Sequence, residues 1–281
     1  MLFKLGVAMT FISLLTSLNS YGQDAFEVWK NKKPLKEQVE NQISDSMNLL
    51  NGINVLKRLY SNNDDVLVKN VIQSILFFNK EMVMQQSFDI VGRIDSGEAI
   101  PVRFTSNEYF YRRREARKVT PTFKSKQEAI RFTKEDPLFH KETDIRICVD
   151  KDGNYYPKQA ILQYTGHRVS WGQTSTITNY TIAHIWEKTD NPLYFGLLWN
   201  YCLIPAPFAF LTDKNDDSDA IVKRVKDLIK AISITLYNPR QLMKPHAVIG
   251  KETPSEEALD KARQLIQENK IQFVPQNNVQ L

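Results

Sequence analysis

The sequence predicts an α+β protein, in which a helical N-terminal half precedes a small mixed α/β unit. Two observations support this prediction. Apolar residues recur at helical spacing through residues 24–88 and again after residue 219, whereas much of the middle alternates apolar and polar residues, as strands do. The hydrophobic share of 42% is that of an ordinary globular protein, so a chain of 281 residues can form a sizeable core.

These patterns divide the chain into four regions. We expect a possible signal peptide at 1–22, a mainly helical N-terminal region with a hairpin at 23–120, an α+β unit at 121–243, and a C-terminal helix and tail at 244–281.

The first residues follow the pattern of a secretory signal peptide. Lys4 gives a positive start, residues 5–18 are mostly apolar, and the small residues Ser20 and Gly22 follow. No acidic residue occurs before Asp24. The pattern predicts a secreted or periplasmic protein with no membrane span after removal of the signal. The alternative is a cytoplasmic protein, because the apolar residues of this run also share one helical face.

Two helices are expected next. Apolar residues recur at helical spacing from Leu35 to Leu50 and again from Val68 to Val83, with a polar Asn-Asn-Asp-Asp break between them. The period changes at Phe88, and residues 88–104 predict a hairpin whose turn contains Gly97.

Five further elements are predicted downstream. They are helices at 124–136 and from Pro157 to Gly166, a strand at 145–149, a helix after the acidic link 215–219 that ends at Asn238, and a helix at 255–269. Residues 150–154, DKDGN, predict a tight turn, since a calcium loop would need further oxygen ligands downstream.

Residues 109–118, YFYRRREARK, combine three aromatic residues with five cations. Such side chains stack on bases and neutralise phosphates, so Arg112, Arg113, Arg114 and Lys118 are candidate nucleic-acid contacts. The net charge of +5 permits a polyanionic partner such as DNA. The alternative is a solvated helix face whose arginine stems cover apolar surface.

The stretch Thr176–Lys214 concentrates residues suited to chemistry. A strand pattern ends near His184, and the proline after Asp190 and Asn191 interrupts it. An apolar run carrying Asn200 follows, and a short helical turn closes the stretch.

This order resembles the HNH, or ββα-metal, nuclease motif. His184-Ile185 matches the strand end, Asn200 matches the asparagine that opens the second segment, and Leu203–Pro205 matches the apolar stretch after it. The resemblance implies a ββα-like core and hydrolysis of DNA phosphodiesters by a metal-dependent endonuclease. His184 would be the general base, Asn200 would orient its loop, and Mg or Mn would stabilise the developing charge.

The last metal ligand of the motif does not match. The family has His or Asn nine or ten residues after the asparagine, where this chain has Ala209 and Phe210. Asp213, which precedes Lys214, is the nearest oxygen donor, and Asp190 in the loop is a further candidate ligand.

A second class of function stays open. A lone histidine on a strand is often a hydrogen-bonded structural residue, which would make the chain a secreted, non-catalytic binding or structural protein. In an oxidising compartment Cys148 and Cys202 would be able to form a disulfide. A Gly-rich phosphate loop, GxSxG and HExxH are all absent from the sequence, which removes the commonest nucleotide-binding, esterase and zincin interpretations.

Overall fold

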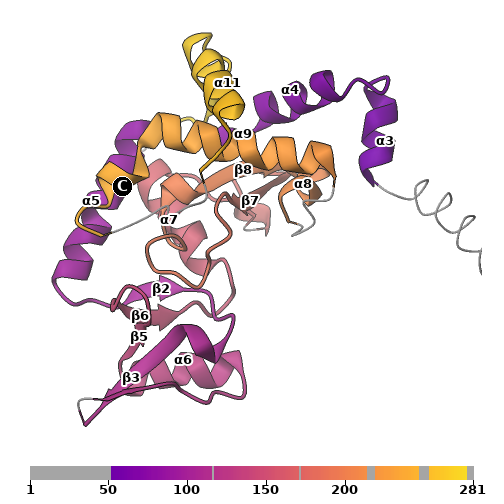
Figure 1. Cartoon of the computed structure of the whole chain (residues 1–281). Coiled ribbons are helices and arrows are strands. Elements are labelled where there is room, and N and C mark those ends of the chain that lie inside the picture. Colours follow the sequence, from indigo (N-terminus) through magenta and orange to yellow (C-terminus); the bar gives the residue numbers. More distant parts are fainter. Residues whose placement is uncertain (1–51, 116, 171, 214–218, 247–252, 277–281) are drawn as a thin grey trace, which may run out of the picture. The chain divides into compact units, whose positions relative to one another are not determined.

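The computed structural model describes residues 52–115, 117–170, 172–213, 219–246 and 253–276 (Figure 1). The chain divides into two compact units, residues 1–63 and residues 64–281. In the first unit the main described element is helix α3 (Gly52–Leu59). The predicted signal peptide at 1–22 and the predicted helix from Leu35 to Leu50 lie outside the described residues.

The second unit is α+β, as the sequence predicts, and it contains two sheets. The first has the order β7-β8-β1-β9, formed by Tyr180–His184, Tyr201–Pro205, Leu76–Phe77 and Gln272–Phe273. β8 pairs antiparallel with both β7 and β1, whereas β1 and β9 are parallel. The β7–β8 register places His184 opposite Tyr201.

The same unit includes the helices α4 (Asp64–Ser74), α5 (Lys80–Asp95), α8 (Phe210–Asp213), α9 (Ala220–Tyr237) and α11 (Glu256–Gln267). The predicted apolar stripe of α9 is buried. Asp219 caps this helix by accepting a hydrogen bond from the Ile221 amide, and Asn238 ends it in the left-handed conformation. A short helix, α10 (Pro239–Leu242), follows.

The second sheet has the order β2-β6-β5-β3-β4. Its strands are Ile100–Val102, Arg146–Val149, Leu138–His140, Phe110–Arg114 and Arg117–Val119. Helix α6 (Lys126–Glu135) supplies Ala129 to a core that includes Phe110, Leu138 and Ile147. Ser125 caps α6 by accepting a hydrogen bond from the Glu128 amide. Helix α7 (Tyr155–Thr165) ends at Gly166, whose φ of 74° suits a residue without a side chain.

Three local predictions are wrong. The helix predicted from Val68 to Val83 is interrupted, because strand β1 separates α4 from α5. Residues 88–95 are the last turns of α5 and not a strand, because buried residues at helical spacing, including Met82, Gln86 and Ile90, extend one face across this segment. The strands β3 and β4 pair as a hairpin where a helix is expected, and Glu115, directly after β3, has a φ of 48°. The five-stranded sheet takes strands from both sides of residue 120, so the expected boundary there passes through it.

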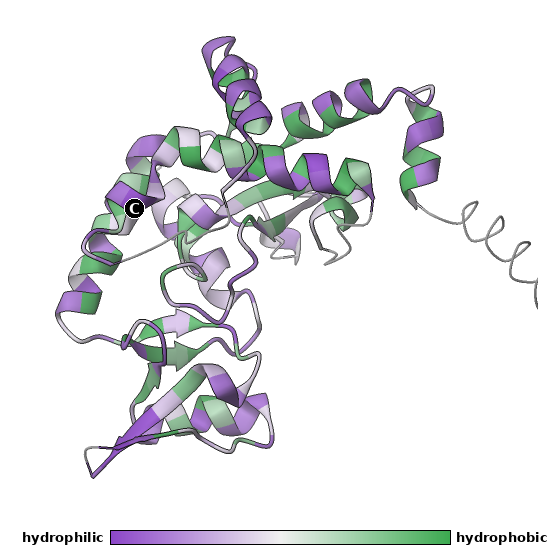
Figure 2. Ribbon diagram, in the orientation of Figure 1, coloured by the Kyte–Doolittle hydropathy of each residue, from purple (hydrophilic) through white to green (hydrophobic). Residues whose placement is uncertain are grey.

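Hydropathy differs sharply along the second unit (Figure 2). Hydrophilic residues cover the end of the β3–β4 hairpin, whereas β8 is buried along nearly its whole length. None of the described helices is long and apolar enough to cross a membrane.

Candidate functional site

The segment from β7 to α8 is a strand, a loop, a second strand and a short helix. β7 ends at His184, residues 185–197 form the loop, and the 3₁₀ turn Leu198–Asn200 leads into β8. A second 3₁₀ turn, Ala206–Phe208, then leads into α8. His184 therefore lies directly before the loop, and Asn200 lies between the loop and β8.

Asn200 holds the two ends of this loop together. Its side chain is fully buried, Oδ1 accepts from the Trp186 amide at 2.8 Å, and Nδ2 donates to the Tyr194 carbonyl at 3.0 Å. The Ile185 amide also donates to the Asn200 carbonyl, at 2.8 Å. Asn200 is therefore bonded to both parts of the loop, near its start at Trp186 and near its end at Tyr194.

Gln86 on α5 is a second clamp on the loop, and the sequence analysis missed it. It is buried, Nε2 donates to the Gly196 carbonyl at 2.7 Å, and Oε1 accepts from the Leu198 amide at 2.6 Å. The signal that pointed to it is a polar residue on the apolar face of a helix, because a buried amide requires partners. The apparent change of period at Phe88, two residues later, obscures that signal in the sequence.

His184 lies against aromatic rings. Its ring stacks on Phe195, with centroids 5.7 Å apart and an interplanar angle of 7°, and it meets the Tyr201 ring edge-on at 5.0 Å. The residue as a whole is half-buried, but its Nε2 is buried and has no hydrogen-bond partner among the described residues. Burial, and secondarily the charge of Arg103, lower the pKa of His184 from 6.5 to about 3. The imidazole is therefore neutral at neutral pH.

A cavity of about 10 Å³ is lined in part by His184, Cys202 and Thr212. This volume is close to the minimum for a single water molecule. It is far too small for a nucleotide.

Arg103 and Asp150 support the other side of this region. The Arg103 guanidinium lies 5.9 Å from the centroid of Phe195 and donates to the Gly153 carbonyl and to Asn154 Oδ1. Asp150 is fully buried, and its oxygens accept hydrogen bonds from the amides of residues 152, 153 and 156. These bonds form the tight turn that DKDGN predicts.

Of the two candidate metal ligands, Asp190 pairs with a different histidine. The Oδ2 atom of Asp190 lies 3.9 Å from the Nε2 atom of His140, which is buried. The backbone of Asp213 ends α8, but its side chain is not among those described. In the part of the chain that the structure describes, no group of three or more His, Cys, Asp or Glu side chains is arranged to hold a metal ion.

The four candidate nucleic-acid contacts all lie on β3 and β4, but their environments differ. Arg112 is mostly buried, lies 3.8 Å from Asp136 and sits 4.4 Å above the Phe132 ring. Arg113 and Lys118 both reach Asp144, at 3.0 and 3.4 Å. Arg114 is exposed.

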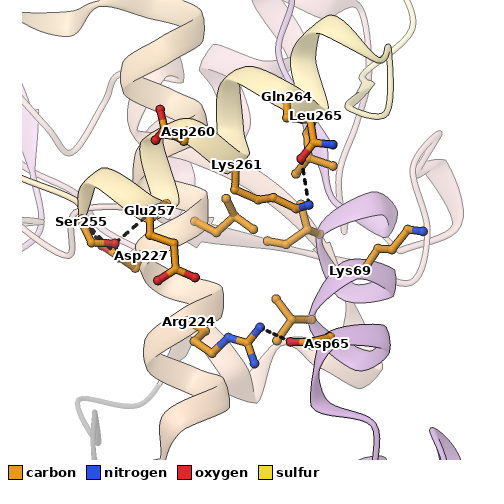
Figure 3. A pocket seen from close by; sticks show the side chains of 14 residues that line it. Asp65, Lys69, Arg224, Asp227, Ser255, Glu257, Asp260, Lys261, Gln264 and Leu265 are labelled. Atoms are coloured by element: carbon orange, nitrogen blue, oxygen red, sulfur yellow. Dashed lines mark hydrogen bonds and ion pairs between the residues drawn. The ribbon is translucent and has the colours of Figure 1, made fainter.

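A separate cavity of about 680 Å³ opens between α4, α9 and α11 (Figure 3). Apolar residues line it together with polar pairs such as Arg224–Asp65 and Ser255–Asp227. No residue of the β7-to-α8 segment lines it. The cavity is therefore distinct from the position of His184.

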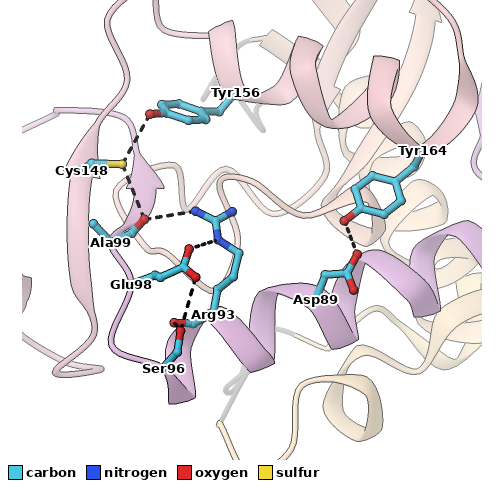
Figure 4. Close-up of polar contacts among 8 residues, drawn as sticks. All are labelled: Asp89, Arg93, Ser96, Glu98, Ala99, Cys148, Tyr156 and Tyr164. Atoms are coloured by element: carbon cyan, nitrogen blue, oxygen red, sulfur yellow. Dashed lines mark hydrogen bonds and ion pairs between the residues drawn. The ribbon is translucent and has the colours of Figure 1, made fainter. Parts of the chain in front are cut away.

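The two cysteines are free and lie on strands of different sheets. Figure 4 shows Cys148 beside the Ala99 carbonyl and the hydroxyl of Tyr156, at 3.8 and 3.7 Å from its sulfur. Burial raises the pKa of the Cys202 thiol to about 12. The disulfide that export would permit is not formed in this structure.

The fold and this segment define an α+β protein with a strand–loop–strand–helix unit. Residues 78–280 match the model of the family described as uncharacterised protein PM1201, and the chain belongs to that family. The match includes the β7-to-α8 segment and the β3–β4 hairpin. No curated protein and no solved structure matches the chain.

Proposed function

We propose that this chain is an HNH-like endonuclease that hydrolyses DNA phosphodiesters, with His184 as its general base. The observation that carries the proposal is the bonding of Asn200, which fixes the loop directly after the strand that ends at His184. The order of strand, loop, strand and helix supports the same proposal.

The protonation state of His184 fits a proton acceptor. With a pKa of about 3 the ring is unprotonated at neutral pH, as a general base must be. A base so weak gives less driving force for proton transfer than one with a pKa near 7, so positioning has to contribute more. The water-sized cavity beside His184 offers room for the nucleophile only. The proposal therefore requires the Phe195 side of the loop to move when a phosphate approaches.

Magnesium or manganese is the proposed cofactor, and its role would be to stabilise charge on the phosphate. The described residues do not fit a complete site for such an ion, since they contain no three-ligand group. Asp213 and Asp190 remain the proposed ligands, although Asp190 already lies beside His140.

A second candidate function is that of a non-catalytic binding protein, secreted or periplasmic. The packing of His184 between aromatic rings favours it, because this is how a structural histidine is held. The cavity between α4, α9 and α11 also favours it, since its 680 Å³ falls within the roughly 300–1,000 Å³ of small-molecule pockets.

Plasmid nicking separates the two candidates. Purified protein with magnesium or manganese is expected to nick supercoiled DNA, and His184→Ala is expected to lower the rate about 10²–10⁴-fold, the usual contribution of a general base. His246→Ala is the matched control, because it removes an imidazole that faces Asp95 in another part of the second unit. Circular dichroism would show whether each variant is folded.

Two results would contradict the proposal. If the wild-type protein cuts neither DNA nor RNA with any of several divalent metals, the binding function replaces it. If nicking persists in folded His184→Ala, the endonuclease has a different general base.

A further inference from the structure

The β3–β4 hairpin places like charges directly opposite each other. In its register Arg113 faces Lys118, and Arg114 faces Arg117. Like charges at directly opposed positions of an antiparallel pair destabilise it. Two such pairs in succession indicate that this end of the hairpin has a role other than stabilising the fold.

The two pairs differ in how their charge is balanced. Asp144 contacts both Arg113 and Lys118, and all three side chains are about half exposed or more. Arg114 and Arg117 are exposed, and neither has an acidic partner among the described residues. The outer pair therefore carries exposed positive charge, and Glu115 is the acidic residue next to it in the sequence.

The cations occupy both faces of the hairpin. Successive side chains on a strand point to opposite faces, so Arg113 shares a face with Tyr111, and Arg114 lies on the other face. The guanidinium of Arg113 lies 4.4 Å from the Phe139 ring, and the Lys118 ammonium lies 4.5 Å from the Tyr111 ring. These contacts with rings hold the inner pair in place while its charged ends remain in water.

We propose that the β3–β4 hairpin enters the major groove of double-stranded DNA, with the outer pair Arg114/Arg117 and the inner pair Arg113/Lys118 contacting phosphates on the two walls of the groove. A two-stranded ribbon fits a groove about 12 Å wide. Because phosphates line both sides of the groove, a ribbon with cations on both of its faces can contact the two DNA strands at once. The choice of DNA as the partner rests on the proposed function, but the binding does not depend on catalysis by His184.

The composition of the hairpin favours DNA over a membrane. Between the two arginines of the outer pair the sequence has only Glu115 and Ala116. Neither is a large apolar side chain of the kind that enters a bilayer.

Asp144 competes with DNA in this arrangement, because it binds the inner pair in the free protein. Its φ of 58° is left-handed, and asparagine adopts that conformation about as readily as aspartate. Asp144→Asn therefore removes the charge and keeps the backbone.

The test is fluorescence anisotropy with a labelled 20-base-pair duplex in EDTA, across a series of salt concentrations. Arg114→Gln combined with Arg117→Gln is expected to weaken binding by about 10-fold or more and to lower the slope of log K against log salt by about 1.8, two contacts at roughly 0.9 each. Asp144→Asn is expected to tighten binding several-fold. Lys261→Gln combined with Arg263→Gln on α11 removes the same charge elsewhere, and it is expected to change the slope little.

The outcomes are distinct from those of the nicking assay, because EDTA prevents metal-dependent cleavage. Tight binding without nicking would contradict the catalytic proposal and leave the hairpin assignment intact. Equal losses in the hairpin and α11 variants would overturn the hairpin assignment. Absence of duplex binding, or binding only to phosphatidylserine vesicles, would overturn it as well.

Discussion

The loop at 185–197 and the β3–β4 hairpin use polar residues in opposite ways. In the loop, the side-chain amides of Asn200 and Gln86 are buried and bonded to backbone groups. In the hairpin, the outer arginines project into water without acidic partners among the described residues. One region uses its polar groups to build the structure, and the other leaves them available for a partner.

The backbone explains this difference. The loop contains no strand, so its buried amides and carbonyls have no ladder to pair with and need side chains or other backbone groups as partners. The strands of the hairpin satisfy their backbone groups by pairing with each other, which releases the side chains. Asn200, which matches the sequence motif, can therefore be required for folding, whereas Arg114 and Arg117, which lie outside the motif, are free to contact DNA.

The largest expected effect is at Asn200. Asn200→Ala removes both side-chain bonds and leaves the Trp186 amide and the Tyr194 carbonyl buried without partners, so we expect the free energy of unfolding to fall by about 3 kcal/mol. Urea denaturation measures it. Asn70→Ala is the matched control, because that amide makes one exposed bond on α4, and its change is expected to stay below about 0.5 kcal/mol. A similar small change at Asn200 would mean that the loop does not depend on this clamp.

The next effect is a pH dependence that originates at His184. Its folded-state pKa of about 3 lies below the ordinary 6.5, so below pH 6.5 the unfolded state binds more protons than the folded state. The stability contribution is complete above about pH 6.5 and is lost as the pH falls toward 3, by up to about 1.4 kcal/mol per pH unit.

Urea denaturation of the wild-type protein and of His184→Gln between pH 7.5 and 5 checks this dependence. The stability difference between the two proteins should shrink by about 2 kcal/mol over the range, since glutamine does not titrate. Parallel pH profiles would show that the ring of His184 is not held neutral, and the contrast between the buried loop and the exposed hairpin would weaken.

The smallest effect lies within the hairpin itself. Arg112 is 13% exposed and packs on Phe132, whereas Arg113 is 57% exposed. Arg112→Gln is therefore expected to lower the free energy of unfolding by about 1 kcal/mol, and Arg113→Gln by less than about 0.5 kcal/mol. Thermal denaturation of the two variants compares them. Equal losses would mean that the hairpin is structural along its whole length.

Local sequence patterns determined several elements well. The helices α6, α7, α9 and α11 each have an apolar stripe and recognisable end signals, such as Asp219 before α9 and Gly166 after α7. These signals depend on residues only a few positions apart, so a single sequence is enough to recognise them. The strand that ends at His184 is predictable for the same reason, because the apolar alternation stops there.

Other features depended on residues far apart in the chain. Residues 88–95 join α5 because its buried face packs against the rest of the second unit, and the basic run forms a hairpin because β3 pairs with both β4 and β5. A boundary at residue 120 passes through the five-stranded sheet for the same reason, because strands on both sides of it pair with each other.

The sequence by itself determined the α+β class, the capped helices, the strand that ends at His184 and the concentration of cations before residue 119. Only the tertiary structure decided that Phe195 and Tyr201 enclose the ring of His184, that Gln86 holds its loop, and that Arg112 is structural while Arg114 and Arg117 are exposed. The physical reason is that burial and partner choice come from contacts between distant segments. Caps, turns and periodicity come from interactions between neighbours.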